Sequence, residues 1–393
     1  MTPLPITHAT LTTSLGRGNA AHLAGLREGR SGLAKCRFDG IALDGYVGEV
    51  DGLGAVELPA ALSDYDARNN RLAWLALHQD GFIGAVTAAR ERFGAHRVAV
   101  LIGTSTSGIL ETERAYRHRT PDGGLPADYR YAETHNTYSA GAFIAQVLGL
   151  GGPSAVVSTA CSSSAKVFAA AARMIDAGWA DAAVVGGIDS LCLTTLHGFH
   201  SLELLSTELC RAWDLDRRGL SPGEGAAFAL LQRDAAQPIG YLLGAGESSD
   251  GHHMSTPPAD GAGALAAMRA ALESAGLQPQ EIDYVNLHGT ATPTNDAAED
   301  RAVSALFGLE TPCSSTKGAT GHTLGAAGAV EAAIVLLALQ HGFIPGGLHV
   351  QRRDPALRIN YLTANRAAPV HRVLSNSFGF GGSNASLVFG AAR

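Results

Sequence analysis

The chain has 393 residues, of which 46% are hydrophobic and 17% charged, and 48 of them are glycine. A chain of this length and composition is long enough to bury a large core in two or three domain-sized units, and it is too poor in charge to be disordered. The net charge of −7, without any lysine- or arginine-rich run, argues against nucleic acid as a partner.

Short apolar runs alternate with longer alanine-rich segments along the whole chain. In the first half we expect a strand, a second strand, a helix and a third strand at Arg97–Gly103, Ala155–Thr159, Ala165–Gly178 and Ala182–Gly186. In the second half we expect a helix, a strand, a helix and a closing strand at Ala262–Gly276, Asp283–Leu287, Gly328–Gln340 and Ala385–Gly390. This alternation predicts α/β layers around largely buried sheets.

No proline- or serine-rich linker divides the chain. A soft boundary lies near Asp234–Gly240, where a strand-like run ends at Pro238. We therefore divide the chain into residues 1–237 and 238–393, and we find no sequence repeat between the two parts.

The cysteines indicate a reducing compartment. Their number is odd, they form no CxxC pair, and they stand at Cys36, Cys161, Cys192, Cys210 and Cys313. The N-terminus lacks the features of a signal peptide, and no stretch reaches the roughly 18 consecutive apolar residues of a membrane span. We therefore expect a cytoplasmic protein without a membrane span.

The segment Val157–Ser164 ends a predicted strand and opens a predicted helix around Cys161. The N–H groups and partial positive charge of a helix N-terminus favour a thiolate and would lower the pKa of this cysteine. The three serines that follow could cap the first turn of the helix. An ordinary buried thiol fits this segment equally well, and it is the preferred interpretation for the other four cysteines.

Two polar, glycine-rich loops each carry a histidine. His288 follows a predicted strand, with Thr290 and Thr292 on alternate positions of an extended segment. The second loop precedes an alanine-rich helix and contains Lys317 and His322. A single histidine at a strand end is more often structural, but two such loops, one with a lysine, favour a site.

A metal centre is the competing interpretation of the histidines. Zinc requires three or four ligands, and Asp296, Glu299 or Asp300 would have to supply some of them. No spacing favours such a set, so we predict no metal.

The chemistry that needs a cysteine and two histidines is acyl transfer followed by carbanion formation. The thiolate would hold an acyl group as a thioester, and two neutral imidazoles would donate hydrogen bonds to an enolate oxygen.

Near the C-terminus, residues 376–384 place three glycines around Phe378 and Phe380. A dinucleotide-binding loop is excluded because the segment precedes a short strand and opens no helix. The segment fits equally a flexible substrate-facing loop with movable aromatic walls and a tight turn with two core phenylalanines.

Taken together, these segments resemble the elongating, Cys–His–His type of β-ketoacyl-[acyl-carrier-protein] synthases. The resembling motifs are STACSSS (158–164), HGTATPTND (288–296), SSTKGATGHTLGAAGAVEA (314–332) and NSFGFGGSNAS (376–386). Further likeness appears in GGID (186–189), RAWDLDRRGLSPGEGAA (211–227) and SLGRGNAAHLAGLREGRSGL (14–33). Four ordered motifs across nearly the whole chain make the resemblance specific.

The resemblance implies an α/β, thiolase-like fold, in which two similar halves form five αβαβα layers, and an acyltransferase that condenses an acyl thioester with malonyl-acyl carrier protein. It implies acyl carrier protein as partner and a homodimer, or a heterodimer with a chain-length-factor-like subunit. It implies no cofactor beyond the phosphopantetheine that the carrier delivers.

Carried over by motif, the family implies a role for each site residue. Cys161 resembles the acylated nucleophile, His288 and His322 the pair that assists decarboxylation, and Lys317 their electrostatic support. Further implied residues are Glu331 in a supporting role, the N–H groups of Cys161 and Phe380 as oxyanion hole, Phe380 as a gate, and Thr290 and Thr292 on the phosphopantetheine arm.

Three relatives fit less well. Thiolases need a second cysteine in the C-terminal glycine loop, Cys–His–Asn synthases lack the second histidine, and chain-length factors lack the nucleophile.

Two segments depart from the fatty-acid enzymes of the family. The loop between Thr207 and Arg211 is short, which leaves Arg68, Arg71, Arg211, Arg217 and Arg218 as candidates for binding an acidic carrier, although each could equally be an intramolecular charge. Thr106 falls where an apolar residue usually enters the acyl pocket, so we hypothesise a synthase of secondary metabolism that builds aryl or other polyene chains.

Overall fold

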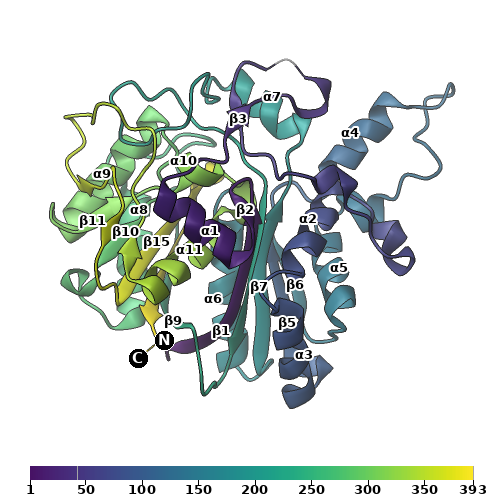
Figure 1. The fold of residues 1–393 in the computed structure, drawn as a ribbon, viewed down its shortest axis with the longest axis horizontal. Coiled ribbons are helices and arrows are strands. Elements are labelled where there is room, and N and C mark those ends of the chain that lie inside the picture. The colour runs from purple at the N-terminus through teal and green to yellow at the C-terminus, as the bar shows by residue number, and fades with distance from the viewer. Residues whose placement is uncertain (42, 393) are drawn as a thin grey trace.

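The computed structural model describes residues 1–41 and 43–392 and is built around a mixed sheet covered by helices (Figure 1). In this part of the chain the main sheet has 12 strands in the order β13-β11-β10-β15-β16-β9-β1-β8-β7-β5-β6, with β2 paired to β1. Their bounds are β1 Leu4–Thr13, β2 Gly16–Arg17, β5 Val98–Gly103, β6 Ser154–Val157, β7 Ala182–Asp189, β8 Gly225–Gln232, β9 Gly240–Ser249, β10 Tyr284–Asn286, β11 Pro312–Ser314, β13 Asn360–Tyr361, β15 Arg372–Gly379 and β16 Ser383–Ala391. Two small sheets pair β3 Ala34–Lys35 with β4 Tyr46–Val47, and β12 Phe343–Ile344 with β14 Arg366–Ala367.

The main sheet consists of two halves with the same topology. One half has the strand order β6-β5-β7-β8-β1, and the other has the order β11-β10-β15-β16-β9. If the five strands of each half are numbered along the chain, both orders read 3-2-4-5-1. The strands β6, β5 and β7 are parallel to one another, as are β11, β10 and β15. The remaining pairings in both halves are antiparallel. The halves join where β1 pairs with β9. The structure thus contains a duplication that the sequence does not reveal, and residues 237 and 238 lie in the connection between the halves.

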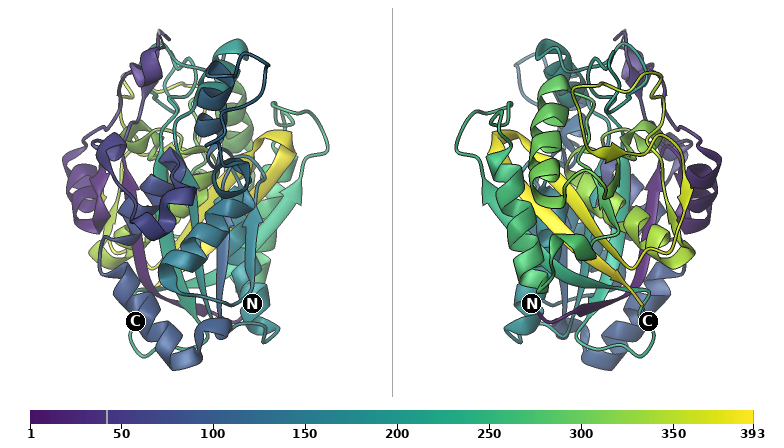
Figure 2. Two further views of the ribbon diagram at one scale, coloured as in Figure 1. Left: turned by 90° about the vertical axis from the view of Figure 1, so that its right-hand side faces the viewer. Right: turned by 90° about the vertical axis from the view of Figure 1, so that its left-hand side faces the viewer.

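Helices complete five layers, as the sequence resemblance implies. The central helices α6 Ser163–Asp176 and α11 Ala327–His341 pack against strands of both halves. One outer layer holds α2 Arg68–Leu77, α3 Phe82–Phe93 and α5 Tyr138–Leu148, and the other holds α8 Ala262–Ala275 and α9 Pro293–Phe307. The right panel of Figure 2 shows the green helices of the C-terminal half over the yellow strands β15 and β16. Smaller helices are α1 Gly18–Glu28, α4 Ile109–Arg117, α7 Leu193–Ser201 and α10 Lys317–Thr320.

The central helix explains the most apolar stretch of the chain. The helical segment Leu324–His341 has a mean hydropathy of 1.5 over 18 residues, which is long and apolar enough for a membrane span by length and composition. Glu331 interrupts its apolar run, so the sequence criterion of consecutive apolar residues misses it. In the fold, 89% of the segment is buried. A helix that packs between the two halves of the sheet is buried on all sides and is apolar for that reason.

Candidate active site

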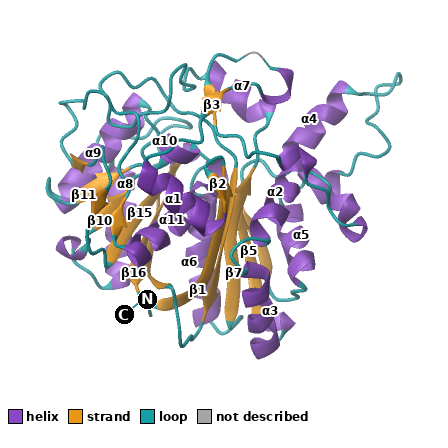
Figure 3. Cartoon of the chain, viewed as in Figure 1, coloured by secondary structure: helices purple, strands orange, loops and turns teal. Residues whose placement is uncertain are grey.

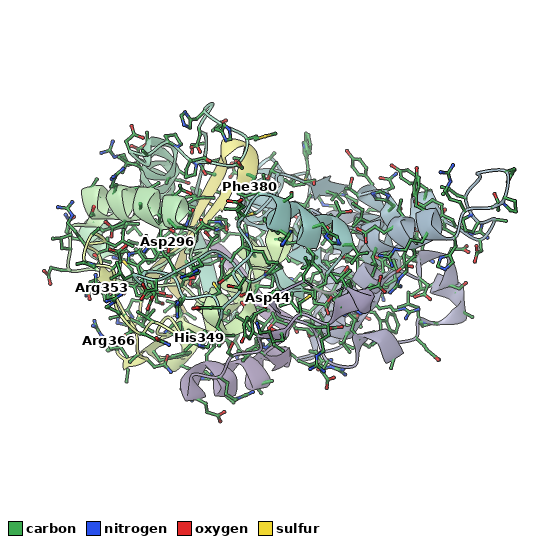
Figure 4. The ribbon with its side chains drawn as sticks, turned by 90° about the horizontal axis from the view of Figure 1, so that it is seen from above. Asp44, Asp296, His349, Arg353, Arg366 and Phe380 are labelled. Carbon is green, nitrogen blue, oxygen red and sulfur yellow. The ribbon has the colours of Figure 1, made fainter. Side chains whose placement is uncertain are left out.

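The polar motifs follow the carboxyl ends of parallel strands and meet at one end of the sheet. The connection from β6 to α6 carries Cys161, the one from β10 to α9 carries His288, and the one from β11 to α11 carries Lys317 and His322. The β15–β16 hairpin brings Phe380 to the same end; Figure 4 labels Phe380 beside the yellow hairpin, and Figure 3 shows the loops gathered there. Such strand ends are where α/β sheets bind ligands.

Cys161 lies in the predicted strand-to-helix turn. Ala160, directly before it, has a φ of 50°, and α6 begins at Ser163, two residues after Cys161. The turn buries the side chain, which is 6% exposed. The following serines do not cap α6 as predicted: Ser163 Oγ donates to the carbonyl of Ala160 at 2.6 Å, and Ser164 Oγ accepts from the N–H of Ala329 at 2.9 Å. The other four cysteines are buried free thiols, as expected.

The structure brings the cysteine and both histidines together. His322 Nε2 lies 3.0 Å from Cys161 Sγ, and the rings of His288 and His322 are 5.3 Å apart between centroids. Within the described residues the Nδ1 atoms of both histidines are buried without a partner. A proton on Nδ1 would therefore be a buried donor without an acceptor, so the neutral rings favour the tautomer with the proton on Nε2. In that form His322 donates toward Cys161.

A buried ion pair lies beside the histidines. Lys317 Nζ is 2.5 Å from Glu331 Oε1 and donates to the carbonyl of His288 at 2.5 Å. Both side chains of the pair are almost fully buried, at 1% and 3% exposure. Burial raises the pKa of Glu331 to about 7, and the Lys317 ammonium opposes that rise. The ammonium therefore has two fixed partners in the C-terminal half, the Glu331 carboxylate and the carbonyl of His288.

Burial decides the protonation states of the site. The sequence predicts a lowered pKa for Cys161, and this is wrong: burial raises the pKa of the thiol to about 11, although Lys317 and the N–H groups of Phe380 and Cys161 favour the thiolate. Burial and the Lys317 charge hold the pKa of His288 and of His322 well below their usual range. The thiol and both imidazoles are therefore neutral at pH 7, as the chemistry predicted for the histidines requires.

Two carboxylates on α9 hold the loop of residues 288–292, and from the sequence they are expected only as alternative metal ligands. Glu299 accepts from the N–H of His288 and of Gly289, both at 2.8 Å. Asp296 accepts from the N–H of Ala291 at 3.2 Å, between the two threonines. Burial raises the pKa of Glu299 to about 7 and that of Asp296 to about 6. Their spacing of three residues at a helix start, directly after the histidine loop, is the signal that could have identified them.

A narrow cavity connects the site to the surface. It has room for about 50 Å³ and is lined by Cys161, His288, His322, Thr290, Thr292, Phe378 and Phe380, among others. The hydroxyls of Thr290 and Thr292 lie 2.9 Å apart, and both phenylalanines are half-buried. The Phe380 ring packs edge-on against the Phe199 ring, with 5.9 Å between the ring centroids. The glycine loop is therefore a turn whose aromatic side chains line the cavity. A larger cavity of about 640 Å³, near the N-terminus and the end of α6, shares no lining residue with it.

Thr106 does not join these residues. It is buried, its hydroxyl donates to Asp189 at 2.6 Å, and it is not among the residues that line the cavity. Its place in the acyl pocket stays a prediction.

Four of the five candidate carrier-binding arginines form ion pairs within the chain. Arg68 pairs with Glu224, Arg71 with Asp66, and the remaining paired ones are Arg211 with Glu208 and Asp214, and Arg217 with Asp296 and Asp354. Arg218 is exposed, and the described residues include no ion-pair partner for it.

The three central side chains also have a geometry that could hold a metal. The ligand atoms of Cys161, His288 and His322 lie within 4.8 Å of one another. The Lys317 ammonium, whose charge already disfavours protonation of both rings, would equally repel a metal cation. The donor set therefore fits a metal poorly.

Sequence comparisons identify the same family over both halves. Residues 69–237 match "Beta-ketoacyl synthase, N-terminal domain", and residues 239–351 match "Beta-ketoacyl synthase, C-terminal domain". The chain is 32% identical to 3-oxoacyl-[acyl-carrier-protein] synthase 2 of Synechocystis sp. over 96% of this chain and 95% of that protein. It is 44% identical to the mitochondrial 3-oxoacyl-[acyl-carrier-protein] synthase of Arabidopsis thaliana, over 61% of this chain and little more than half (57%) of that protein.

Solved ketosynthases share the whole architecture. A ketosynthase (ApeO) in complex with its chain length factor (ApeC) from Xenorhabdus doucetiae has a TM-score of 0.90 at 38% identity, over 99% of this chain and 98% of that chain. The ishigamide ketosynthase/chain length factor has a TM-score of 0.89 at 28% identity, over 100% and 99%.

Proposed function

The chain belongs to the β-ketoacyl synthase family, and on that premise we propose that Cys161, His288, His322 and Lys317 carry out its decarboxylative condensation of an acyl thioester with malonyl-acyl carrier protein. Membership makes the chain an acyltransferase of the 3-oxoacyl-[acyl-carrier-protein] synthase type. One observation carries the assignment of residues: the Cys161 thiol lies 3.0 Å from His322 Nε2, in the cavity that His288 also lines.

In the first half-reaction the Cys161 sulfur attacks the acyl thioester carbon, and the carrier leaves as a thiol that takes the cysteine proton. The N–H groups of Cys161 and Phe380, which favour the thiolate form of this sulfur, would form the oxyanion hole for the tetrahedral intermediate. The cysteine now holds the acyl group as a thioester.

In the second half-reaction malonyl thioester loses CO2 and forms an enolate. The Nε2–H groups of His288 and His322 donate to the enolate oxygen, and the Lys317 ammonium adds a positive field. The enolate carbon attacks the Cys161 thioester, which releases a 3-oxoacyl thioester. The thiolate that remains accepts a hydrogen bond from His322 until it gains a proton from solvent.

We propose acyl carrier protein as the partner that delivers both substrates on phosphopantetheine, with no further cofactor. The curated relatives carry this carrier in their names, and the hydroxyls of Thr290 and Thr292 line the cavity through which the arm would pass. Among the five candidate arginines, Arg218 is the exposed one without an ion-pair partner in the described residues, and we propose it for contact with an acidic carrier. Free thiols favour the reducing cytoplasm as the place of action.

We propose a dimer as the working unit. The family resemblance favours a homodimer, and the ketosynthases solved with their chain length factors support a heterodimer as the second candidate. We further propose chain elongation in secondary metabolism, of aryl polyenes or other polyenes, and the similar ketosynthases solved with chain length factors support polyketide- or polyene-type elongation. Turnover of polyunsaturated primers faster than saturated ones is the expected result, and a clear preference for saturated primers would refute this specificity.

Intact-protein mass spectrometry tests the reaction. Wild type mixed with acyl-carrier thioesters should gain one acyl mass, Cys161→Ala should gain none, and malonyl-carrier should discharge the adduct as a 3-oxoacyl product. Absence of any adduct on the isolated chain would instead support a non-catalytic subunit that shapes the tunnel of a second synthase. Product without chain extension would identify a hydrolase or a decarboxylase.

A further inference from the structure

Asp189 is a buried carboxylate at the end of β7, next to the catalytic turn but outside the cavity lining. Its side chain is 0% exposed. Burial raises the pKa of this carboxyl, which the donors of the neighbouring loop oppose, and its charge disfavours the Cys161 thiolate. The reaction assigned to the cysteine does not use this carboxylate.

Among the described residues, the hydrogen bonds that the Asp189 carboxylate accepts all come from one loop, residues 104–106, at the end of β5. Oδ1 accepts from Thr104 Oγ1 at 2.8 Å, from the N–H of Ser105 at 2.9 Å, and from Thr106, whose N–H and hydroxyl lie at 2.7 and 2.6 Å. Oδ2 accepts from the same N–H of Ser105 at 3.0 Å. A charged carboxylate that satisfies this many donors fixes the loop strongly.

Ser105 connects this loop to both catalytic segments. Its hydroxyl donates to the carbonyl of Ala160 at 3.2 Å, in the peptide directly before Cys161. A Cβ added to Gly325, three residues after His322, would lie 2.6 Å from the N–H nitrogen of Ser105 and 2.6 Å from Asp189 Oδ2. The backbone after His322 therefore packs directly on the Asp189–Ser105 pair.

The surrounding packing leaves no room for the two segments to adjust. A Cβ on Gly187, two residues before Asp189, would lie 2.8 Å from the Cα of Ala326 and 2.5 Å from the Cβ of Ser164. The N-terminal half holds Cys161, and the C-terminal half holds His322. The Asp189–Ser105 pair lies at the point where their loops meet.

We propose that Asp189 is a positioning residue that, through Ser105, sets the distance between Cys161 Sγ and His322 Nε2; this rests on the proposed function of the site. Asp189 touches neither substrate nor the reacting atoms. Displacement of a reacting group by about 1 Å can cost about 10²-fold in rate, so a residue that holds this distance controls the acylation step.

Two variants separate the effect of Asp189 on the position of Cys161 from the effect of its negative charge. Asp189→Asn places an NH2 group against backbone donors, so we expect the acylation rate at saturating acyl-carrier to fall by about 10²-fold with little change in KM. Ser105→Ala removes only the hydrogen bond to Ala160, so we expect a fall of about three- to tenfold. Acylation is followed by intact mass, and the pH midpoint of iodoacetamide alkylation is measured in parallel. The midpoint should move to lower pH in Asp189→Asn, which loses a negative charge, and stay unchanged in Ser105→Ala.

Asp300→Asn is the matched control. Asp300 is also a buried carboxylate with several donors, namely Trp213 Nε1 and the N–H groups of Arg358 and Ile359. Within the described part of the chain, none of its hydrogen bonds goes to the segments that carry Cys161, His288 or His322. We expect this variant to lose stability but to acylate at the wild-type rate per folded molecule. Folded Asp189→Asn that acylates at the wild-type rate, or a loss as large in Asp300→Asn, would overturn the positioning role. Wild type that does not acylate at all would refute the proposed function instead.

Discussion

Removing the Lys317–Glu331 pair one member at a time should destabilise the protein strongly, whereas removing both members should not. The two charges are 2.5 Å apart and 1% and 3% exposed, so either one left alone would be a buried charge without its partner. Loss of one partner of such a pair costs roughly 3–5 kcal/mol, whereas replacement of both by neutral groups is often close to neutral. We therefore expect Lys317→Met/Glu331→Gln to recover most of the stability lost by Glu331→Gln.

The pH separates the two single variants. Burial already raises the pKa of Glu331 to about 7, and without the ammonium it rises further. The isolated carboxyl of Lys317→Met can therefore take up a proton, whereas Glu331→Gln has no carboxyl to titrate at this position. Because the folded pKa exceeds the unfolded one, Lys317→Met should be most stable at low pH and lose stability as the pH rises from about 5 through 7.

Activity should not follow stability in this cycle. The double variant lacks the positive field beside His288 and His322, so we expect malonyl decarboxylation to stay reduced by about 10²- to 10³-fold, the range for loss of a preorganised electrostatic group. Urea unfolding gives the free energies, and CO2 release from malonyl-carrier gives the rate. Recovery of turnover in the double variant would refute the electrostatic role, and a double variant as unstable as the worse single one would refute the coupling.

A surface pair supplies the control for the cycle. Arg372 and Glu281 are 2.7 Å apart, but their side chains are 35% and 38% exposed. Such pairs contribute about 0–1 kcal/mol, so Arg372→Met should change neither stability nor turnover appreciably.

Three further predictions concern the residues around the site. Glu299→Gln should displace His288 and lower kcat. Because the folded pKa of Glu299 is raised to about 7, the free energy of unfolding of wild type should fall by up to about 3 kcal/mol between pH 4.5 and 7, and that of the variant should not. Equal pH slopes of the two unfolding free energies would contradict this. Thr290→Val/Thr292→Val should raise KM for carrier thioesters and leave kcat unchanged, and a lower kcat at constant KM would exclude arm binding. Phe380→Ala should open the narrow cavity beside Phe199 and increase malonyl decarboxylation without condensation, which CO2 and product counts measure; tight coupling in the variant would exclude the gate.

The sequence predicts the position of the nucleophile and the bases because their signals are local. A polar, glycine-rich segment after an apolar run is a loop at a strand end, and its residues stay with that strand end in the fold. For this reason Cys161, His288 and His322 lie where the motifs place them. The helix start beside Cys161 is also a local feature of the sequence. The pKa of the Cys161 thiol is not, because it depends on burial by other segments of the chain.

What the sequence could not supply depends on residues far away in the chain. The pKa of Cys161 rises because other segments bury the thiol, and burial outweighs the Lys317 charge. Arg68 was a candidate for carrier binding until the fold paired it with Glu224, 156 residues away. Thr106 was a candidate pocket wall, and its hydroxyl is bound to Asp189, 83 residues away.

The duplication explains why one site needs both halves. In each half the connection after the third strand leads into a central helix, and these two connections carry Cys161 in one half and Lys317 and His322 in the other. Helices α6 and α11 pack together between the two halves of the sheet, and their first turns are in contact, so the nucleophile faces its histidine. The connection after the second strand carries His288 in the C-terminal half and the loop of residues 104–106 in the N-terminal half. Equivalent positions therefore hold a base in one half and the support of the nucleophile in the other, which is why Asp189 acts on the chemistry without touching the substrate.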